Sequence, residues 1–361
     1  MRVLIEFENK PLFFDQPRRE IVCVDPARLG EAFDEVTRAV KEGHWVAGFA
    51  SYEAGLCLEP ALGVLAAPSF PLVHFGVFDR PRAPGAMATG SFSVRDRGVN
   101  VTREEYGRDI DRIREHIRTG DVYQITYCIK KRFSFSGSAW ALYQALKKVQ
   151  PVPYAAYAEA GGNTVLSLSP EMFLKKRGGA ITVKPMKGSW PRGGPVNDLL
   201  GGWLLQRDPK NRAENVMIAD LLRNDLGRIG RRVRTPALFE VARYRTIYQM
   251  TSTVTAAIDP GIALQTVFQA IFPSGSVTGA PKVEAMRIIR EIEREPRQIY
   301  TGAVGYVSPE GEMFFNVPIR TLLLQSGDGE MGIGGGIVWD STADGEWAEG
   351  QWKAAFLNEV M

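Results

Sequence analysis

The sequence has few of the residues that build disulfide frameworks, zinc sites or Ser-His-Asp triads, with three cysteines and three histidines among 361 residues. The cysteines Cys23, Cys57 and Cys128 are odd in number and form no CxxC pair, which is typical of a reduced, cytoplasmic protein. None of the histidines has a serine, cysteine or metal-ligand spacing around it, which argues against a catalytic triad and against a zinc site.

Long apolar runs and an excess of one charge are also absent. No stretch of about 18 apolar residues occurs, and Glu6, Glu8 and Lys10 interrupt the N-terminal segment, so we expect neither a membrane span nor a signal peptide. The 44 basic and 41 acidic side chains leave a formal charge of +3 and are scattered along the chain. Nucleic-acid and membrane partners are therefore not expected.

The composition, with 45% hydrophobic and 24% charged residues, is that of an ordinary globular protein. The best candidate boundary is the Pro/Gly/Ala stretch at 80–90, which reads RPRAPGAMATG. Strands such as MRVLIEFE before it have too few partners to close a core alone. We therefore expect residues 1–90 to be an N-terminal region that contributes to the same globule as the main domain, residues 91–361.

Hydrophobic periodicity and capping signals predict runs of strands with helices interspersed. Thr102 and Glu105 form a capping box for a helix that Gly120 is placed to end. Further helices are expected at 139–149, 212–224, 282–293 and from about Glu346, and only one helix before residue 80. The helix at 212–224 is expected to bury a stripe made of Ala213, Val216, Met217, Leu221 and Leu222. The absence of a regular βαβ period favours an α+β fold.

Three carboxylates are candidates for a magnesium site. Glu346 and Glu349 share one face of the last helix, and Glu214 lies near the start of the helix at 212–224. Carboxylate oxygens suit Mg²⁺, although two glutamates on a terminal helix are more often a solvated face. The glycines at 332–336 approximate a nucleotide motif but are followed by Ile337 and Val338 instead of a helix start. They indicate either close strand packing or a group that approaches too closely for any Cβ.

Together these segments resemble the chorismate-utilising enzymes. The resemblance runs from about Thr102 to the C-terminus, with motifs in the order of that family: GDVYQITY, SLSPEMF, VKPMKGSWPRG, KNRAENVMIADLLRNDLGRI, YQMTSTV, FPSGSVTGAPKVEAMRII, TGAVGY, IRT, GGGIVWDS and EWAEGQWKA. It implies an α+β sandwich of two large antiparallel sheets with flanking helices, and a cleft that binds chorismate and Mg²⁺. GFASYEAG, residues 48–55, also resembles the N-terminal region of the aminodeoxychorismate synthases within this family.

The resemblance also implies roles for individual residues. Glu171 matches the general acid that protonates the departing C4 hydroxyl of chorismate. Glu214 and Glu349 match the Mg²⁺ ligands, with Glu346 close behind them. The positions that match substrate-binding residues are Gly188, Ser189, Ser276, Tyr300, Arg320, Gly334, Gly336 and Lys353.

Lys187 separates the branches of the family. Anthranilate and salicylate synthases carry Ala at this place, whereas aminodeoxychorismate synthases carry Lys, which attacks C2 and forms a covalent adduct that ammonia resolves at C4. Gln124 stands where isochorismate and salicylate synthases have a water-activating Lys, and Gln249 stands where several relatives have His. The expected activity is conversion of chorismate and ammonia to 4-amino-4-deoxychorismate, as by a component I. The alternatives are an anthranilate synthase component I and a non-catalytic chorismate-binding homologue.

The resemblance implies protein partners as well. All three histidines precede Cys128, so no glutaminase Cys-His pair is expected in these 361 residues. A separate glutamine amidotransferase subunit would supply the ammonia. No lyase domain is expected either, so a separate aminodeoxychorismate lyase would release p-aminobenzoate for folate biosynthesis.

Overall fold

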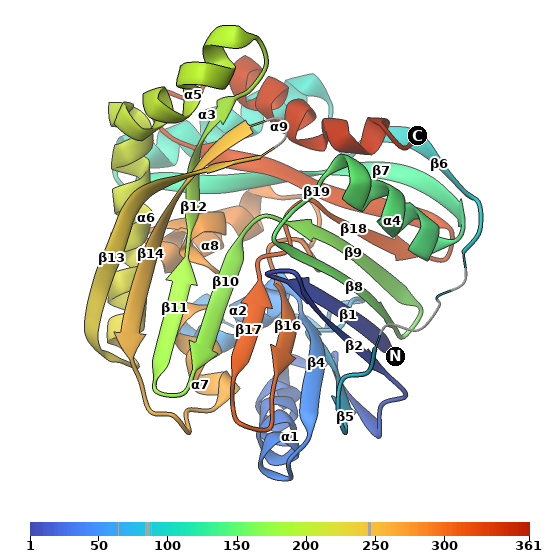
Figure 1. The fold of residues 1–361 in the computed structure, drawn as a ribbon. Coiled ribbons are helices and arrows are strands. Elements are labelled where there is room, and N and C mark those ends of the chain that lie inside the picture. Colours follow the sequence, from blue (N-terminus) through green and yellow to red (C-terminus); the bar gives the residue numbers. More distant parts are fainter. Residues whose placement is uncertain (64, 84–86, 88, 245–246) are drawn as a thin grey trace.

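Two large antiparallel sheets form the body of the protein in a computed structural model that describes residues 1–63, 65–83, 87, 89–244 and 247–361. In the view of Figure 1 the first sheet crosses the upper right and the second fans out below it. This architecture confirms the predicted α+β fold with two antiparallel sheets. Among the described residues, no helix is long and apolar enough to cross a membrane.

The strand orders show that each sheet is assembled from distant parts of the chain. The first sheet runs β15 (Gly279–Ala280), β7 (Gln124–Gly137), β19 (Asp328–Ile337), β18 (Thr321–Gln325), β9 (Asn163–Ser169), β8 (Tyr154–Ala160), β1 (Arg2–Phe7) and β2 (Lys10–Asp15), and β6 (Phe92–Val99) also pairs with β7. The second runs β12 (Met186–Pro191), β14 (Ile247–Ala257), β11 (Ala180–Lys184), β10 (Met172–Arg177), β17 (Met313–Asn316), β16 (Ala303–Val307), β4 (Trp45–Ala50), β5 (Val73–Phe78) and β3 (Arg19–Cys23), and β13 (Arg231–Arg243) pairs with β14.

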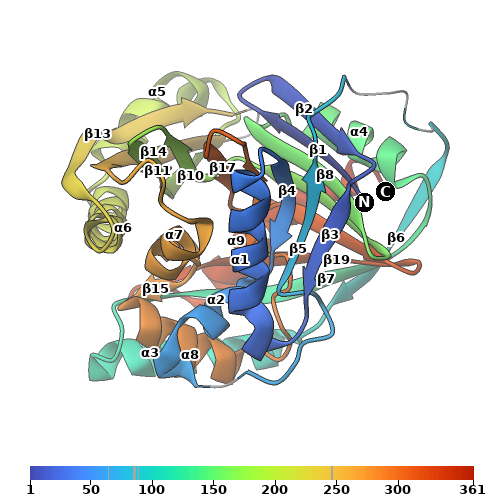
Figure 2. The ribbon, with the colours of Figure 1, turned by 90° about the horizontal axis from the view of Figure 1, so that it is seen from below.

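Helices cover the outer faces of both sheets. Their bounds are α1 (Leu29–Lys41), α2 (Tyr52–Leu58), α3 (Arg103–Thr119), α4 (Ala139–Val149), α5 (Pro195–Arg207), α6 (Pro209–Gly227), α7 (Leu264–Ile271), α8 (Lys282–Ile292) and α9 (Ala343–Asn358). Short 3₁₀ turns occur at Pro26–Arg28, Pro60–Leu62 and Gly275–Val277. Figure 2 shows α1 beside α7, where the rings of Phe33 and Phe268 lie 5.7 Å apart.

Three hydrophobic clusters account for the layered packing. One joins α1, α6 and α7 to the second sheet, and another joins α3, α4, α8 and α9 to the first. The third lies between the sheets, where Val3 and Ile5 of β1 meet Phe49 of β4 and Phe314 of β17. Burial of apolar surface on both faces of each sheet therefore holds the molecule together.

Most helix predictions are confirmed, and the capping signals explain why. The Thr102 hydroxyl accepts from the Glu105 amide and the Glu105 carboxylate accepts from the Thr102 amide, while Gly120 ends α3 in the left-handed conformation with φ 85°. The prediction of one helix before residue 80 is wrong, because α1 and the short α2 both form there. Part of the predicted boundary at 80–90 lies outside the described residues.

The predicted apolar stripe of α6 is confirmed at Leu222 and wrong at Ala213 and Val216. Ala213 and Val216 are exposed, whereas the buried face of the helix contains Asn215, Ile218 and Leu222. A pattern based on apolar residues alone misses the buried Asn215. The predicted inward face of α6 is therefore rotated by about one residue from the face that is buried in the structure.

The N-terminal region supplies strands to both sheets. Strand β1 pairs with β8 in the first sheet, and β4 pairs with β16 in the second. The Glu53 carboxylate of α2 accepts hydrogen bonds from the Arg297 and Gln298 amides at 2.8 and 3.0 Å. We propose on these contacts that residues 1–90 fold only together with residues 91–361.

A truncated chain that starts at residue 95 tests this proposal. Without β1 and β4 the facing edges of β8 and β16 lose their partners, so we expect the truncated chain to be insoluble or to lack a cooperative thermal transition. Soluble expression and calorimetry measure both properties. A soluble, cooperatively folded truncated chain would refute the proposal.

Candidate active site

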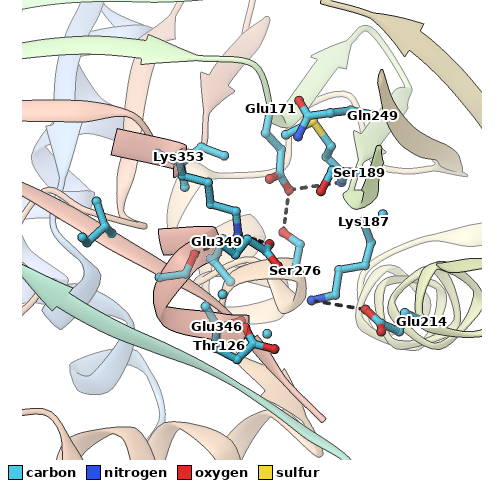
Figure 3. Close-up of a pocket in the computed structure, with 18 of the residues that line it drawn as sticks. Thr126, Glu171, Lys187, Ser189, Glu214, Gln249, Ser276, Glu346, Glu349 and Lys353 are labelled. Carbon is cyan, nitrogen blue, oxygen red and sulfur yellow. Dashed lines mark hydrogen bonds and ion pairs between the residues drawn. The ribbon is translucent and has the colours of Figure 1, made fainter. Parts of the chain in front are cut away.

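A cavity of about 270 Å³ lies among β12, the start of α6, β19 and α9. Every candidate site residue named from the sequence lines this one cavity (Figure 3). They are Glu171, Lys187, Gly188, Ser189, Glu214, Ser276, Tyr300, Arg320, Gly334, Gly336, Glu346, Glu349 and Lys353. The fold therefore gathers residues that span more than half of the chain into a single site.

The glycines of β19 are explained by the side chains that lie against this strand. A Cβ on Gly332 would meet the Tyr300 ring at 2.2 Å, and a Cβ on Gly336 would meet Lys187 Nζ at 2.2 Å and Gln124 Nε2 at 2.6 Å. Because no side chain can occupy those positions, the glycines leave room for Lys187 and Tyr300. Both predicted alternatives are therefore found on β19, because a Cβ on Gly334 would meet the Tyr127 carbonyl of β7 at 2.2 Å, which is close strand packing.

Lys187 points from β12 toward α6, where its Nζ lies 4.0 Å from Glu214 Oε2 (Figure 3). Its side chain is 11% exposed. Burial lowers the pKa of Lys187, and the charge of Glu214 opposes this effect in part. The neighbouring Gly188 has φ 96°, and a Cβ there would meet Asn211 Oδ1 at 2.9 Å.

Glu171 faces the same cavity from the connection between β9 and β10. The carboxylate is buried, and its Oε1 accepts from the Ser276 hydroxyl at 2.5 Å and from the Met186 amide at 3.4 Å (Figure 3). Burial raises the pKa of Glu171 to about 7, although the bond from Ser276 opposes the shift. A carboxylic acid of this kind can carry a proton near neutral pH and deliver it.

The carboxylates of α9 have different environments. Glu349 pairs with Lys353 Nζ at 2.7 Å, and this lysine holds the pKa of Glu349 below its ordinary value. Glu346 accepts from the Ser341 hydroxyl at 2.6 Å, but burial and then the charge of Glu349 raise the pKa of Glu346. In the part of the chain that the structure describes, no three acidic, histidine or cysteine side chains are gathered closely enough to hold a metal.

Unpartnered polar atoms line the cavity. Arg320 Nη1, Thr126 Oγ1 and Gln249 Oε1 are buried and have no hydrogen-bond partner among the described residues. Burial lowers the pKa of Arg320 to about 10, so the guanidinium still carries its charge at neutral pH. Buried polar groups without partners cost stability, and they are typical of a wall that a polar, anionic ligand completes.

Lining residues that the sequence patterns did not single out include Thr126, Lys210 and Asn211. Lys210 and Asn211 precede Glu214 by about one helical turn, and the charge of Lys210 contributes to the lowered pKa of Glu349. Lys210 and Asn211 precede Glu214 by four and three residues, so they share its face of α6. This spacing could have predicted that they line the site, but only if the inward face of the helix had been known.

Comparisons with known proteins show the family of this chain. Residues 82–359 match the family of chorismate binding enzymes. The chain is 40% identical over 254 residues to aminodeoxychorismate synthase component 1 of Klebsiella aerogenes, a match that covers 70% of this chain and 56% of that relative. It is 35% identical over 276 residues to anthranilate synthase component 1 of Methanothermobacter thermautotrophicus, covering 76% of this chain and 60% of that relative.

The solved structures share the fold. Anthranilate synthase component I from Streptococcus pneumoniae superposes with a TM-score of 0.77 at 24% identity, over 98% of this chain and 89% of that one. The match covers 56% of the length of the relative from Klebsiella aerogenes and 39% of the aminodeoxychorismate synthase of Streptomyces griseus, so the chain spans only part of the curated relatives. Because the family match covers most of the chain, this protein belongs to the family of chorismate binding enzymes.

Proposed function

We propose that this protein converts chorismate and ammonia to 4-amino-4-deoxychorismate, as the component 1 of an aminodeoxychorismate synthase. The observation that carries the proposal is a buried lysine, Lys187, that lines one cavity with the buried acid Glu171 in a chorismate binding enzyme. Relatives at 34 to 40% identity bear the name aminodeoxychorismate synthase component 1, which supports the same assignment.

The chemistry uses one nucleophile and one acid. The neutral amine of Lys187 attacks C2 of chorismate, the ring double bonds shift, and the C4–O bond breaks. Glu171 gives its proton to the departing hydroxyl, which leaves as water, and the attacking nitrogen loses a proton. Ammonia then attacks C4, the double bonds shift back, and the C2–N bond to Lys187 breaks. The balance is chorismate and ammonia giving 4-amino-4-deoxychorismate and water.

The charges around the cavity suit the two carboxylates of chorismate. Arg320 offers a planar fork for one carboxylate, and its buried Nη1 has no partner among the described residues. Tyr300 and Lys353 contribute further donors, and the glycines Gly334 and Gly336 leave the backbone of β19 accessible to the ring. Gly188, Ser189 and Ser276 complete the wall in this proposal.

Magnesium is proposed as the cofactor. Glu214, Glu346 and Glu349 line the cavity with hard oxygen donors, and the charge of Glu349 raises the pKa of Glu346, a repulsion that a divalent cation would relieve. These carboxylates are not gathered into a finished cluster, so water and substrate would complete the ligand set. When bound, Mg²⁺ supplies positive charge that binds a chorismate carboxylate and favours loss of the C4 hydroxyl.

Two protein partners follow from this assignment. The component 1 in the names of the relatives points to a second component, which we propose to be a glutamine amidotransferase subunit that supplies ammonia. A separate aminodeoxychorismate lyase would consume the product.

Anthranilate synthase is the second candidate, because relatives with that name reach 35% identity, but the residue at position 187 favours the covalent route.

The covalent role of Lys187 is tested with a charge-preserving variant. Lys187→Arg cannot provide a neutral amine at neutral pH, so we expect it to lose nearly as much activity as Lys187→Ala. Wild-type protein with chorismate and Mg²⁺ but no ammonia should gain the mass of chorismate less one water on the Lys187 peptide. Lys184→Arg on β11, whose lysine pairs with Glu240 away from the cavity, is the matched control. An active Lys187→Arg variant, together with no adduct on a protein that turns over, would end the covalent proposal.

The acid role of Glu171 predicts a pH dependence. Since the acid must carry its proton and its pKa lies at about 7, kcat should fall as the pH rises through neutrality. Glu171→Gln keeps the size and an acceptor oxygen, and it should reduce kcat by about 10²- to 10⁴-fold and remove this limb of the profile. Steady-state rates between pH 6 and 9 provide the measurement. If kcat of Glu171→Gln still falls above neutral pH as in the wild type, a group other than Glu171 causes this pH dependence.

The metal proposal predicts a shifted magnesium requirement. Glu349→Gln removes one anionic ligand, so turnover at ordinary Mg²⁺ concentration should be abolished and should return in part only at much higher Mg²⁺. Magnesium titrations of activity measure the shift, and circular dichroism checks the fold. Near-normal activity with an unchanged Mg²⁺ requirement would remove Glu349 from the site.

A further inference from the structure

The backbone of Lys187 is held by a buried asparagine that the proposed chemistry does not use. Asn215 Nδ2 donates to the Lys187 carbonyl at 3.1 Å, and the asparagine is 1% exposed. Asn215 follows Glu214 directly in α6, and the Glu214 carboxylate lies 4.0 Å from Lys187 Nζ. Two consecutive residues of α6 therefore lie against Lys187, Asn215 at its backbone carbonyl and Glu214 at its amine.

A second hydrogen bond fixes the orientation of the Asn215 amide. The Ser252 hydroxyl accepts from the Phe239 amide at 3.3 Å and donates to Asn215 Oδ1 at 2.5 Å. The Lys187 carbonyl can only accept, so Asn215 must turn its NH₂ group toward this carbonyl, and the Ser252 hydroxyl donates to the remaining amide oxygen. The amide oxygen of Asn215 therefore faces Ser252, and its NH₂ group faces the Lys187 carbonyl.

Strand β12 also forms a backbone hydrogen bond with the Glu171 carboxylate. The Met186 amide donates to Glu171 Oε1 at 3.4 Å, so the two neighbouring residues Met186 and Lys187 of β12 are bonded through their backbones to Glu171 and to Asn215. The strand needs such support, because the register of β12 against β14 shifts between Met186 and Ser189, and Gly188 lies there with φ 96°. Without Asn215 the Lys187 carbonyl would lose this side-chain donor, next to a glycine with a left-handed backbone.

We propose that Asn215, oriented by Ser252, is a positioning residue that fixes Lys187 for attack on the substrate. This proposal rests on the nucleophilic role of Lys187 given above. Asn215 touches neither the amine nor the substrate. It acts through the peptide of Lys187, so its loss should slow adduct formation and leave chorismate binding in place.

Substitutions at both residues separate positioning from binding. Asn215→Asp keeps the size but replaces the NH₂ donor by an oxygen that faces the Lys187 carbonyl, so adduct formation should slow by about tenfold or more while the KM for chorismate stays within about twofold. Ser252→Ala should show a smaller loss of the same kind, and Ser252→Thr, which keeps a hydroxyl, should restore most of the rate. Quenched-flow mass spectrometry of the Lys187 peptide measures the rate.

Asn316→Asp is the matched control. Asn316 of β17 is fully buried, and its Nδ2 donates to the Tyr154 carbonyl at 2.8 Å, away from the cavity lining. The same isosteric change there should lower the melting temperature without changing the adduct rate. A general cost of placing aspartate in the interior would instead slow both variants alike, and that result would overturn the proposal.

Amide hydrogen exchange keeps this test independent of the proposed function. In Asn215→Asp the peptide that covers residues 186–190 should exchange faster than in wild type, and in Asn316→Asp it should not. If wild-type protein forms neither adduct nor 4-amino-4-deoxychorismate, the proposed function fails. The exchange data still test whether the hydrogen bond from Asn215 holds the backbone of β12. Wild-type adduct and exchange rates in Asn215→Asp, or a raised KM with unchanged kcat, would overturn the positioning role.

Discussion

The burial of one amine against a glycine-rich strand is the constraint on which the site depends. Lys187 Nζ occupies space that a side chain at Gly336 would fill, and the surrounding protein lowers its pKa. A buried ammonium is costly, so the amine is displaced toward its neutral, nucleophilic form. The charge of the facing Glu214 carboxylate raises the pKa of Lys187 and so limits this effect.

The cavity is lined by segments that lie far apart in the sequence, from Thr126 to Lys353. β12 and α6 present Lys187 and Glu214, while β19 and α9 present the glycines and Glu349, and each sheet takes strands from the N-terminal region. Helix α2 adds a link through Glu53 to the peptides at 297–298, just before Tyr300. The cavity therefore lies where distant segments meet, and its shape depends on the packing of both sheets.

Local sequence signals predict most of the helices and the residues that line the cavity. The inward face of α6 could not be predicted in this way, because it depends on contacts between distant residues. The capping box at Thr102 and the stop at Gly120 are decided within a few residues, so α3 was predicted well. The inward face of α6 includes Asn215, a buried polar residue whose amide bonds to Lys187 and Ser252, and no apolar pattern reveals such a residue. Helix α5 was not predicted, because Gly201 and Gly202 weaken the helical signal of its sequence, although the helix itself is continuous.

Product analysis tests the central claim most directly. Purified full-length protein is given chorismate, Mg²⁺ and ammonium, and the products are separated and identified by mass and by fluorescence. The account predicts 4-amino-4-deoxychorismate, with pyruvate still attached, and its loss in Lys187→Ala. Formation of anthranilate with release of pyruvate, or recovery of unchanged chorismate from a folded protein that binds it, would contradict the account.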